Sequence, residues 1–140
     1  MVTVMKGSGN GAELACCGHL AQVFELLGKR WTALLVDVLM QRPARFSELR
    51  RAVPGLSDRV MSERLRELMD AGIVEREVDA GPPVCSTYRL TAAGRRLAPG
   101  LNELRRWAAE VAGDEVDEHE LAHLEPLSLT SAATADVGRS

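Results

Sequence analysis

The sequence contains few aromatic residues, few cysteines and no long apolar segment. Two Phe, one Tyr and two Trp in 140 residues mean that aliphatic side chains must build most of the core. No apolar run approaches the ~20 residues that span a membrane, and the first residues lack the apolar stretch of a secretory signal. Three cysteines without an export signal favour free thiols in a reducing compartment. We therefore expect a cytoplasmic protein without a disulfide framework.

Motifs typical of enzymes are also scarce. The sequence has no Gly-rich phosphate loop, no Ser/His/Asp order of a hydrolase and no deaminase signature. Residues 119–123 (HELAH) do have the H-E-x-x-H spacing of zinc proteases. Their flanks are charged rather than apolar, Pro126 ends the segment, and only Glu125 and Asp136 lie nearby as a third ligand. We therefore predict no catalytic residue, no metal site and no cofactor.

Charge is distributed unevenly along the chain. The net charge of −3 argues at first against a nucleic-acid partner. Residues 1–112, however, hold 16 Lys and Arg against 13 Asp and Glu, whereas residues 113–140 hold one Arg against seven acids. Because DNA affinity depends on local phosphate neutralisation rather than on overall charge, a mildly basic body with an acidic tail is compatible with DNA binding.

Composition divides the chain into three parts. Residues 1–11 are rich in Gly, Ser and Asn, and we expect them to be disordered. Residues 12–112 contain enough apolar residues for one folded domain. Residues 113–140 are acidic and then rich in Ser, Thr and Ala, which predicts a largely disordered tail.

Residues 46–72 have the pattern of two short helices joined by a tight turn. The Pro-Gly pair at positions 54–55 ends the first helix. Ser57 is a favourable N-cap for the second helix, and Gly72 is placed to end it. The apolar residues of the two helices recur at helical spacing: Phe46, Leu49 and Val53, then Met61, Leu65, Leu68 and Met69.

The second of these helices has a polar face opposite its apolar stripe. At ~100° per residue, Arg59, Ser62, Glu63 and Arg66 fall on the side away from Leu65. Arg and Ser on an exposed helix suit contacts with phosphates and base edges, although many surface helices carry such residues. The two helices and their turn together predict a helix-turn-helix.

The other segments predict helices before this unit and a β-hairpin after it. Residues 13–27 and 31–40 have helical apolar stripes. Residues 73–79 and 84–90 have strand patterns, and Gly81-Pro82-Pro83 predicts the turn between them. A helix-turn-helix followed directly by a hairpin is a winged helix. The predicted fold is therefore mostly α with a small β-hairpin, in the α+β class.

Residues 92–112 predict a long helix that Thr91 caps and that Pro99-Gly100 kinks or splits. Its apolar stripe extends beyond the compact body. We expect it to pack on a symmetry mate, with the alternative that it folds back on the first helix. The N- and C-terminal helices are thus the predicted dimerisation elements.

A series of short motifs appears in a fixed order between residues 17 and 107. They are Cys17, Leu27-Gly28-Lys29-Arg30-Trp31-Thr32, Arg45-Phe46-Ser47-Glu48-Leu49, Val53-Pro54-Gly55-Leu56-Ser57, Leu65-Arg66-Glu67-Leu68, Gly72-Ile73-Val74-Glu75-Arg76, Gly81-Pro82-Pro83, Tyr88-Arg89-Leu90-Thr91, Gly94, Leu104 and Trp107. In this order and at this spacing they resemble the bacterial HxlR-type regulators, a winged-helix family related to the MarR regulators.

The resemblance implies a homodimeric, cytoplasmic and nucleoid-associated transcription regulator that binds an inverted-repeat operator in double-stranded DNA. In such proteins the second helix of the helix-turn-helix enters the major groove, and the wing follows the backbone or the minor groove. Carried over to this sequence, the DNA-facing residues are Arg45, Ser47, Ser57, Arg59, Ser62 and Arg66, with Lys29, Arg30 and Arg76 as further phosphate contacts.

Two positions depart from the family pattern. The wing commonly has a basic residue after the Pro-Pro pair, but this chain has Val84-Cys85. Where the usual pattern has Cys-Pro, this chain has Cys17-Gly18. The first departure puts the wing contact in question.

Cys17 occupies the position that resembles the family's redox- or electrophile-sensing cysteine. Its place near the start of a helix favours a thiolate, since the helix dipole is positive there. A free Cys is, alternatively, a small buried hydrophobic residue. A bridge between Cys17 and Cys85, or one between subunits, is a further alternative, whereas adjacent cysteines such as Cys16 and Cys17 rarely pair.

Three readings of function therefore stand side by side. The first is an operator-binding homodimer that responds to an oxidant or electrophile through Cys17. The second is a regulator that responds to a small molecule without thiol sensing. The third is a winged-helix protein-interaction module, which the acidic tail and the missing wing base favour.

Overall fold

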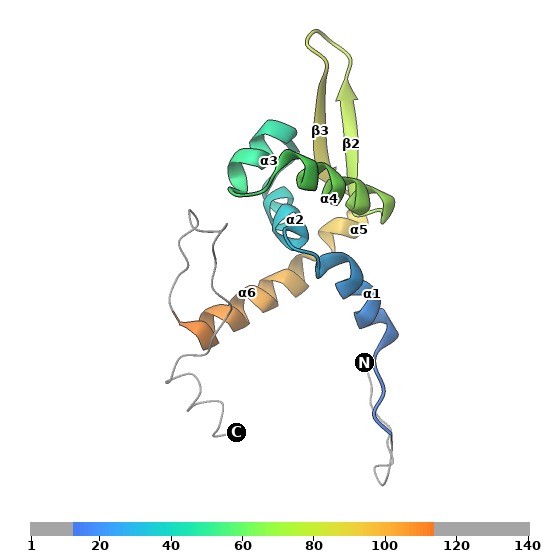
Figure 1. Ribbon diagram of the computed structural model, residues 1–140, viewed down its shortest axis with the longest axis vertical. Coiled ribbons are helices and arrows are strands. Elements are labelled where there is room, and N and C mark those ends of the chain that lie inside the picture. The colour runs from blue at the N-terminus through green and yellow to red at the C-terminus, as the bar shows by residue number, and fades with distance from the viewer. Residues whose placement is uncertain (1–12, 114–140) are drawn as a thin grey trace.

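The computed structural model describes residues 13–113. Figure 1 shows a body of short helices with a β-hairpin projecting from one end and two helices, α1 and α6, extending from the other. None of the described helices has the length and apolar character needed to cross a membrane. The elements follow in the order α1 (Gly18–Leu27), α2 (Thr32–Gln41), β1 (Ala44–Arg45), α3 (Phe46–Ala52), α4 (Asp58–Asp70), β2 (Val74–Asp79), β3 (Cys85–Leu90), α5 (Ala92–Arg95) and α6 (Ala98–Ala112).

The fold is a winged helix-turn-helix, as predicted: α3 and α4 form the helix-turn-helix, and β2 and β3 form the wing. The wing is part of a three-stranded antiparallel sheet with the order β1-β3-β2. The third strand, β1, is absent from the prediction. It has only two residues, in which Ala44 pairs with Tyr88 and Arg45 with Thr87. Two residues are too few for a strand period, so only the pairing with β3 defines it.

One aliphatic core joins α2, α3, α4 and the base of the sheet. The predicted stripes are confirmed, because Leu49, Val53, Met61, Leu65 and Leu68 are buried and Phe46 and Met69 pack against the cluster. Helix α2 lies at the centre of this core with Leu35, Val36 and Leu39.

Three helix boundaries differ from the predicted ones. Helix α1 begins at Gly18 rather than at residue 13, because Cys17 has an extended backbone and its Sγ accepts from the Leu20 N–H at 3.4 Å. Helix α2 begins after Trp31, which has a left-handed φ of 81°. The C-terminal helix splits at positions 96–97 rather than at Pro99, which lies in the first turn of α6, where its missing N–H has no cost.

Both ends of α4 are fixed by local hydrogen bonds. The Ser57 hydroxyl accepts from the Val60 N–H at 3.2 Å. At the other end Gly72 has a φ of 80°, and its N–H donates to the Met69 carbonyl while the Ile73 N–H donates to Leu68. This pair of bonds is a Schellman motif, which ends a helix sharply. The wing therefore begins at a defined angle immediately after α4.

Replacing Gly72 by Ala should destabilise the protein by about 1 kcal/mol, because a residue with a Cβ is strained at positive φ. A Cβ at Gly72 would meet no atom within 4 Å, so the cost is one of backbone conformation and not of packing. Thermal unfolding should shift down by about 4–8 °C. Gly100→Ala is the matched control, since its Cβ also meets nothing within 4 Å but its helical backbone favours Ala. Equal melting temperatures for the two variants would contradict this account.

Candidate nucleic-acid interface

The exposed face of α4 carries three of the predicted DNA contacts. Arg59, Ser62 and Arg66 are all exposed, while Met61 and Leu65 face the core. The side chain of Arg59 is 88% exposed. The helix therefore presents two guanidinium groups and a hydroxyl on one side, while its opposite side is packed in the core.

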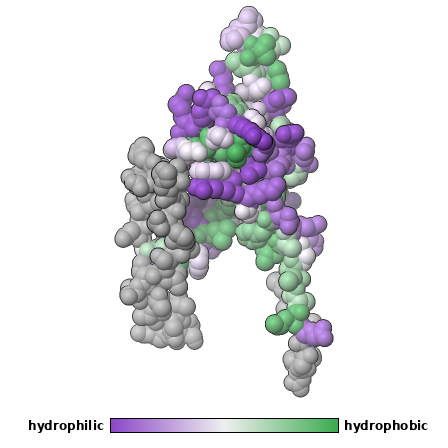
Figure 2. Space-filling model, in the orientation of Figure 1, coloured by the Kyte–Doolittle hydropathy of each residue, from purple (hydrophilic) through white to green (hydrophobic). Residues whose placement is uncertain are grey.

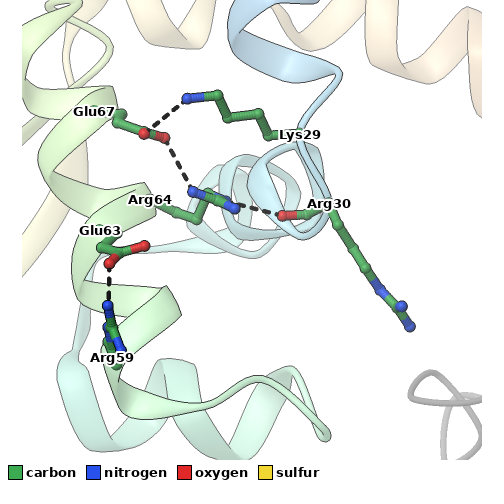
Figure 3. Close-up of polar contacts among 6 residues, drawn as sticks. All are labelled: Lys29, Arg30, Arg59, Glu63, Arg64 and Glu67. Carbon is green, nitrogen blue, oxygen red and sulfur yellow. Dashed lines mark hydrogen bonds and ion pairs between the residues drawn. The ribbon is translucent and has the colours of Figure 1, made fainter.

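The charges around these groups differ between the two arginines. Figure 3 shows Glu63 pointing toward Arg59, and the Arg59 Nε lies 3.4 Å from the carboxylate. Arg66 borders a shallow depression with Glu63, Glu67 and Asp70. Within residues 13–113 Arg66 makes no hydrogen bond or ion pair, so its donors are available to a ligand. The guanidinium groups of Arg59 and Arg66 can therefore bind phosphate or base acceptors without breaking a strong contact within the protein.

Residues 42–51 contain four arginines and one glutamate, and ion pairs with neighbouring carboxylates use part of this basic cluster. Arg50 contacts Asp58 at the start of α4, at 2.7 Å. Arg42 contacts Glu48 at 2.9 Å, and Glu48 also accepts from the Arg45 N–H at 2.9 Å. Two of the four arginines are therefore paired at the surface with carboxylates of the same chain. The side chains of Arg45 and of Ser47 remain exposed.

These contacts make Glu48 more acidic in the folded protein than an ordinary glutamate. Its hydrogen bond with Arg42, reinforced by the Arg45 N–H, lowers its pKa to about 2. A lowered folded pKa contributes stability above the unfolded value near 4.5, and this contribution disappears as pH falls toward 2.

We expect the melting temperature of the wild type to fall more steeply between pH 4.5 and pH 2 than that of Glu48→Gln. Gln preserves the acceptor for the Arg45 N–H but does not titrate. Thermal scans of both proteins across this range measure the difference, and parallel pH profiles would count against the proposed role of Glu48.

The wing separates its charges between two faces. Side chains alternate between the two faces of a strand, and Val74 of β2 is buried. Glu75, Glu77 and Asp79 therefore lie on the opposite, outer face of the sheet. Arg89 reaches across from β3 to Glu77 and to Glu75, the latter at 3.4 Å. Arg76 lies on the face of Val74 instead, opposite Tyr88. The acids are thus kept apart from the one predicted contact residue in the wing.

The junction between α1 and α2 contacts the flank of α4. The Lys29 Nζ lies 2.9 Å from Glu67, and the Arg64 Nε donates to the Arg30 carbonyl at 3.2 Å. Figure 3 shows both contacts, with the Arg30 side chain pointing away from α4. The Arg30 guanidinium lies over the Trp31 ring, 4.6 Å from its centroid. Lys29 and Arg30 are therefore outside the exposed face of α4.

Sequence reasoning missed Arg64, whose side chain is only 19% exposed. It lies three residues after Met61 and four before Leu68, which places it beside the buried stripe rather than opposite it. This spacing indicates that Arg64 is partly buried, but it does not identify the acceptor of Arg64, the Arg30 carbonyl, which lies 34 residues away in the chain.

All three cysteines are free, and Cys85 lies far from the adjacent Cys16 and Cys17 (Figure 1). Cys17 is exposed, so the buried alternative for this residue is wrong in the described chain. Cys85 starts β3 at the tip of the wing, and α1 lies at the opposite end of the molecule (Figure 1), so the two residues form no bridge within one chain.

Exposed apolar residues gather away from the helix-turn-helix. Figure 2 shows hydrophilic residues over much of the body and apolar residues along α1. Leu20 and Phe24 of α1 are more than half exposed, as is Leu104 of α6, and half of the Trp107 surface is exposed. Figure 1 shows α1 and α6 diverging, so α6 does not fold back on α1.

The predicted terminal segments and the residue 119–123 motif lie outside the described residues.

Comparison with known proteins gives consistent relatives. The sequence pattern of the family described as HxlR-like helix-turn-helix matches residues 26–116. The HTH-type regulator YvaP of Bacillus subtilis, itself uncharacterised, is 46% identical over 94 residues, which are 67% of this chain and 87% of YvaP. The regulator YodB of the same organism is 41% identical over 74% of this chain and 95% of YodB.

Solved structures agree with these matches. The reduced form of YodB superposes with a TM-score of 0.65 at 37% identity, over 73% of this chain and 100% of that one. A regulator from Enterococcus faecalis, described as a MarR-family protein, superposes with a TM-score of 0.60 at 31% identity, over 70% of this chain and 90% of that one. The chain therefore belongs to the HxlR-like helix-turn-helix family, whose members are DNA-binding transcriptional regulators and not enzymes.

Proposed function

We propose that the protein binds an inverted-repeat operator as a homodimer, with α4 of each subunit in the major groove. The observation that carries this proposal is the exposed face of α4, on which Arg59, Ser62 and Arg66 project from a helix anchored by its buried side. An α-helix fits the major groove, where Arg recognises guanine through two acceptors.

Phosphate contacts would surround this face. Arg45, Ser47 and Ser57 belong to or precede the two helices of the helix-turn-helix, and Arg76 belongs to the wing. The Ser57 oxygen accepts from the Val60 N–H, so its own O–H can still donate to a phosphate. We place Lys29 and Arg30 as peripheral phosphate contacts at the flank of the interface.

The dimer interface in this proposal uses α1 and α6, as parts of a single domain spanning residues 12–112. Their half-exposed apolar side chains, among them Phe24 and Trp107, would be buried between two copies. Burial of such residues is the main favourable term in protein association. A twofold dimer would place two copies of α4 on the same side of the DNA, about 34 Å apart. The protein would act in the cytoplasm on the nucleoid.

A footprint of the purified protein on the DNA upstream of its own coding region tests the proposal. We expect protection of two half-sites related by a twofold axis, with an affinity that falls steeply as salt rises. A folded dimer that forms no salt-sensitive complex would instead favour the protein-interaction module.

Cys17 is the proposed site of redox or electrophile regulation. It is exposed and its Sγ caps α1, so oxidation or alkylation would remove a helix cap within the proposed dimer interface. Structures of YodB are described as quinone-bound and diamide-treated, the former at 39% identity and the latter at 41%. Such reagents are therefore the first effectors to test on this chain.

Cys17→Ser should abolish any loss of DNA binding caused by diamide or a quinone, while binding of the untreated protein stays near that of the wild type. Ser also caps helices, so the variant removes the reactive sulfur and preserves the structural role. Cys16→Ser and Cys85→Ser are the controls, and both should respond as the wild type does. Gel shifts with and without reagent give the readout. An unchanged response of Cys17→Ser would favour a regulator that senses a small molecule without this thiol.

A further inference from the structure

The flank of α4, between its buried stripe and its exposed face, is attached to a segment far away in the sequence. Arg64 donates from Nε to the Arg30 carbonyl at 3.2 Å and from Nη1 to Glu67 at 3.4 Å. The other oxygen of Glu67 accepts from Lys29 at 2.9 Å. Figure 3 shows these contacts as one connected set between α4 and the junction of α1 and α2.

The junction to which α4 is attached has a sharply defined backbone. Trp31 has a φ of 81°, and the Thr32 N–H donates to the Lys29 carbonyl at 3.2 Å. A left-handed conformation in a residue other than Gly persists only where its surroundings determine it closely. Thr32, the first residue of α2, is completely buried. The Arg30 carbonyl therefore offers Arg64 an acceptor at a fixed position.

From this arrangement we propose that Arg64, Glu67 and Lys29 are positioning residues for DNA recognition, which set the orientation of α4 relative to α1. The proposal rests on the proposed function of α4. Partly exposed ion pairs of this kind contribute little to stability, so their main effect is on geometry. Arg59 lies five residues before Arg64, or about 7.5 Å along the helix, so a tilt of ~10° about Arg64 would move Arg59 by about 1.3 Å. Such a shift exceeds the tolerance of a hydrogen bond to a base edge.

This role and the phosphate contact proposed for Lys29 predict different results for a charge exchange. Lys29→Glu and Glu67→Lys each break the pair, whereas the double variant re-forms it with reversed charges. Asp70→Lys is the matched control, since it adds the same charge to the exposed side of α4 without contacting Lys29. Arg64→Lys keeps the charge but lacks the planar group that reaches two acceptors.

The test compares affinities for two duplexes by fluorescence anisotropy. One is the duplex that the wild type enriches most from a random-sequence library, and the other is a scrambled duplex of the same composition. The ratio of the two affinities measures specificity, and the salt dependence of each counts phosphate contacts. Thermal unfolding of each variant establishes that it is folded.

We expect Lys29→Glu, Glu67→Lys and Arg64→Lys each to lower the specificity ratio about tenfold, at a melting temperature near that of the wild type. The double exchange should restore the ratio only in part, because it re-forms the pair between positions 29 and 67 but removes the carboxylate that Arg64 contacts. Asp70→Lys should raise the affinity for both duplexes alike. Unchanged ratios in the single variants, or additive losses in the double variant, would overturn the positioning role. If the wild type enriches no duplex, the proposed function itself fails, which is a distinct outcome.

Discussion

The double variant Arg59→Ala, Arg66→Ala is expected to bind its operator more weakly than the wild type by a factor of about 30 or more, because each arginine bidentate to a guanine is worth about 1–3 kcal/mol. Both side chains are exposed on one face of α4, and in the described part of the chain Arg59 contacts only Glu63, at 3.4 Å. Binding to scrambled DNA should weaken much less, so specificity should fall together with affinity. Anisotropy titrations at fixed salt measure both quantities.

Two single variants, Arg66→Ala and Arg96→Ala, separate base recognition from a general loss of positive charge. Arg96 is exposed outside the helix-turn-helix, so Arg96→Ala removes one positive charge without touching α4. Arg66→Ala should relax base preference at one position of each half-site, whereas Arg96→Ala should leave the preference unchanged. If both variants weaken operator binding to the same small extent, α4 does not read bases in the proposed way.

Replacing Leu65 by Ala, on the opposite side of the same helix, should destabilise the fold by about 2–5 kcal/mol. Leu65 is 1% exposed and lies in the cluster with α2 and the sheet, so its loss leaves a cavity in the core. Since small proteins have only ~5–15 kcal/mol of stability in total, this is a large share. Denaturant unfolding at a fixed protomer concentration measures the change, because dimerisation would make the midpoint depend on concentration.

Ser62→Ala provides the control, because Ser62 is exposed three residues before Leu65. Its effect on stability should stay within about 0.5 kcal/mol, while its effect on operator binding should be measurable. The buried face of α4 would then determine stability, and its exposed face would determine DNA recognition. A Leu65→Ala variant as stable as Ser62→Ala would mean that the core around α4 is far more adaptable than its burial indicates.

The helix-turn-helix could be predicted from the sequence because its signals are local. The spacing of Leu65 and Leu68 defines a buried stripe, Ser57 caps the helix that carries it, and Gly72 ends it. Each of these depends on neighbours within a few residues, where backbone geometry fixes which side chains can meet. The exposure of Arg59 and Arg66 then follows, because they lie opposite the stripe.

The predictions that the structure changed concern contacts between distant residues. The basic cluster at 42–51 is less basic than its sequence indicates, since Arg42 and Arg50 are paired with Glu48 and Asp58. Likewise β1 exists only because β3 lies beside it. Composition counts charges along the chain, but it does not show which of them neutralise one another across a turn.

By itself, the sequence determined the family, the winged helix-turn-helix and the face of α4 that is open to a ligand, because periodicity and capping are properties of neighbouring residues. Only the tertiary structure decided how α4 is held: Arg64 and Glu67 reach the junction of α1 and α2 across 34 and 38 positions of sequence. Partners so far apart meet only when the core has brought their helices together, and no local pattern encodes which acceptor a given guanidinium will find.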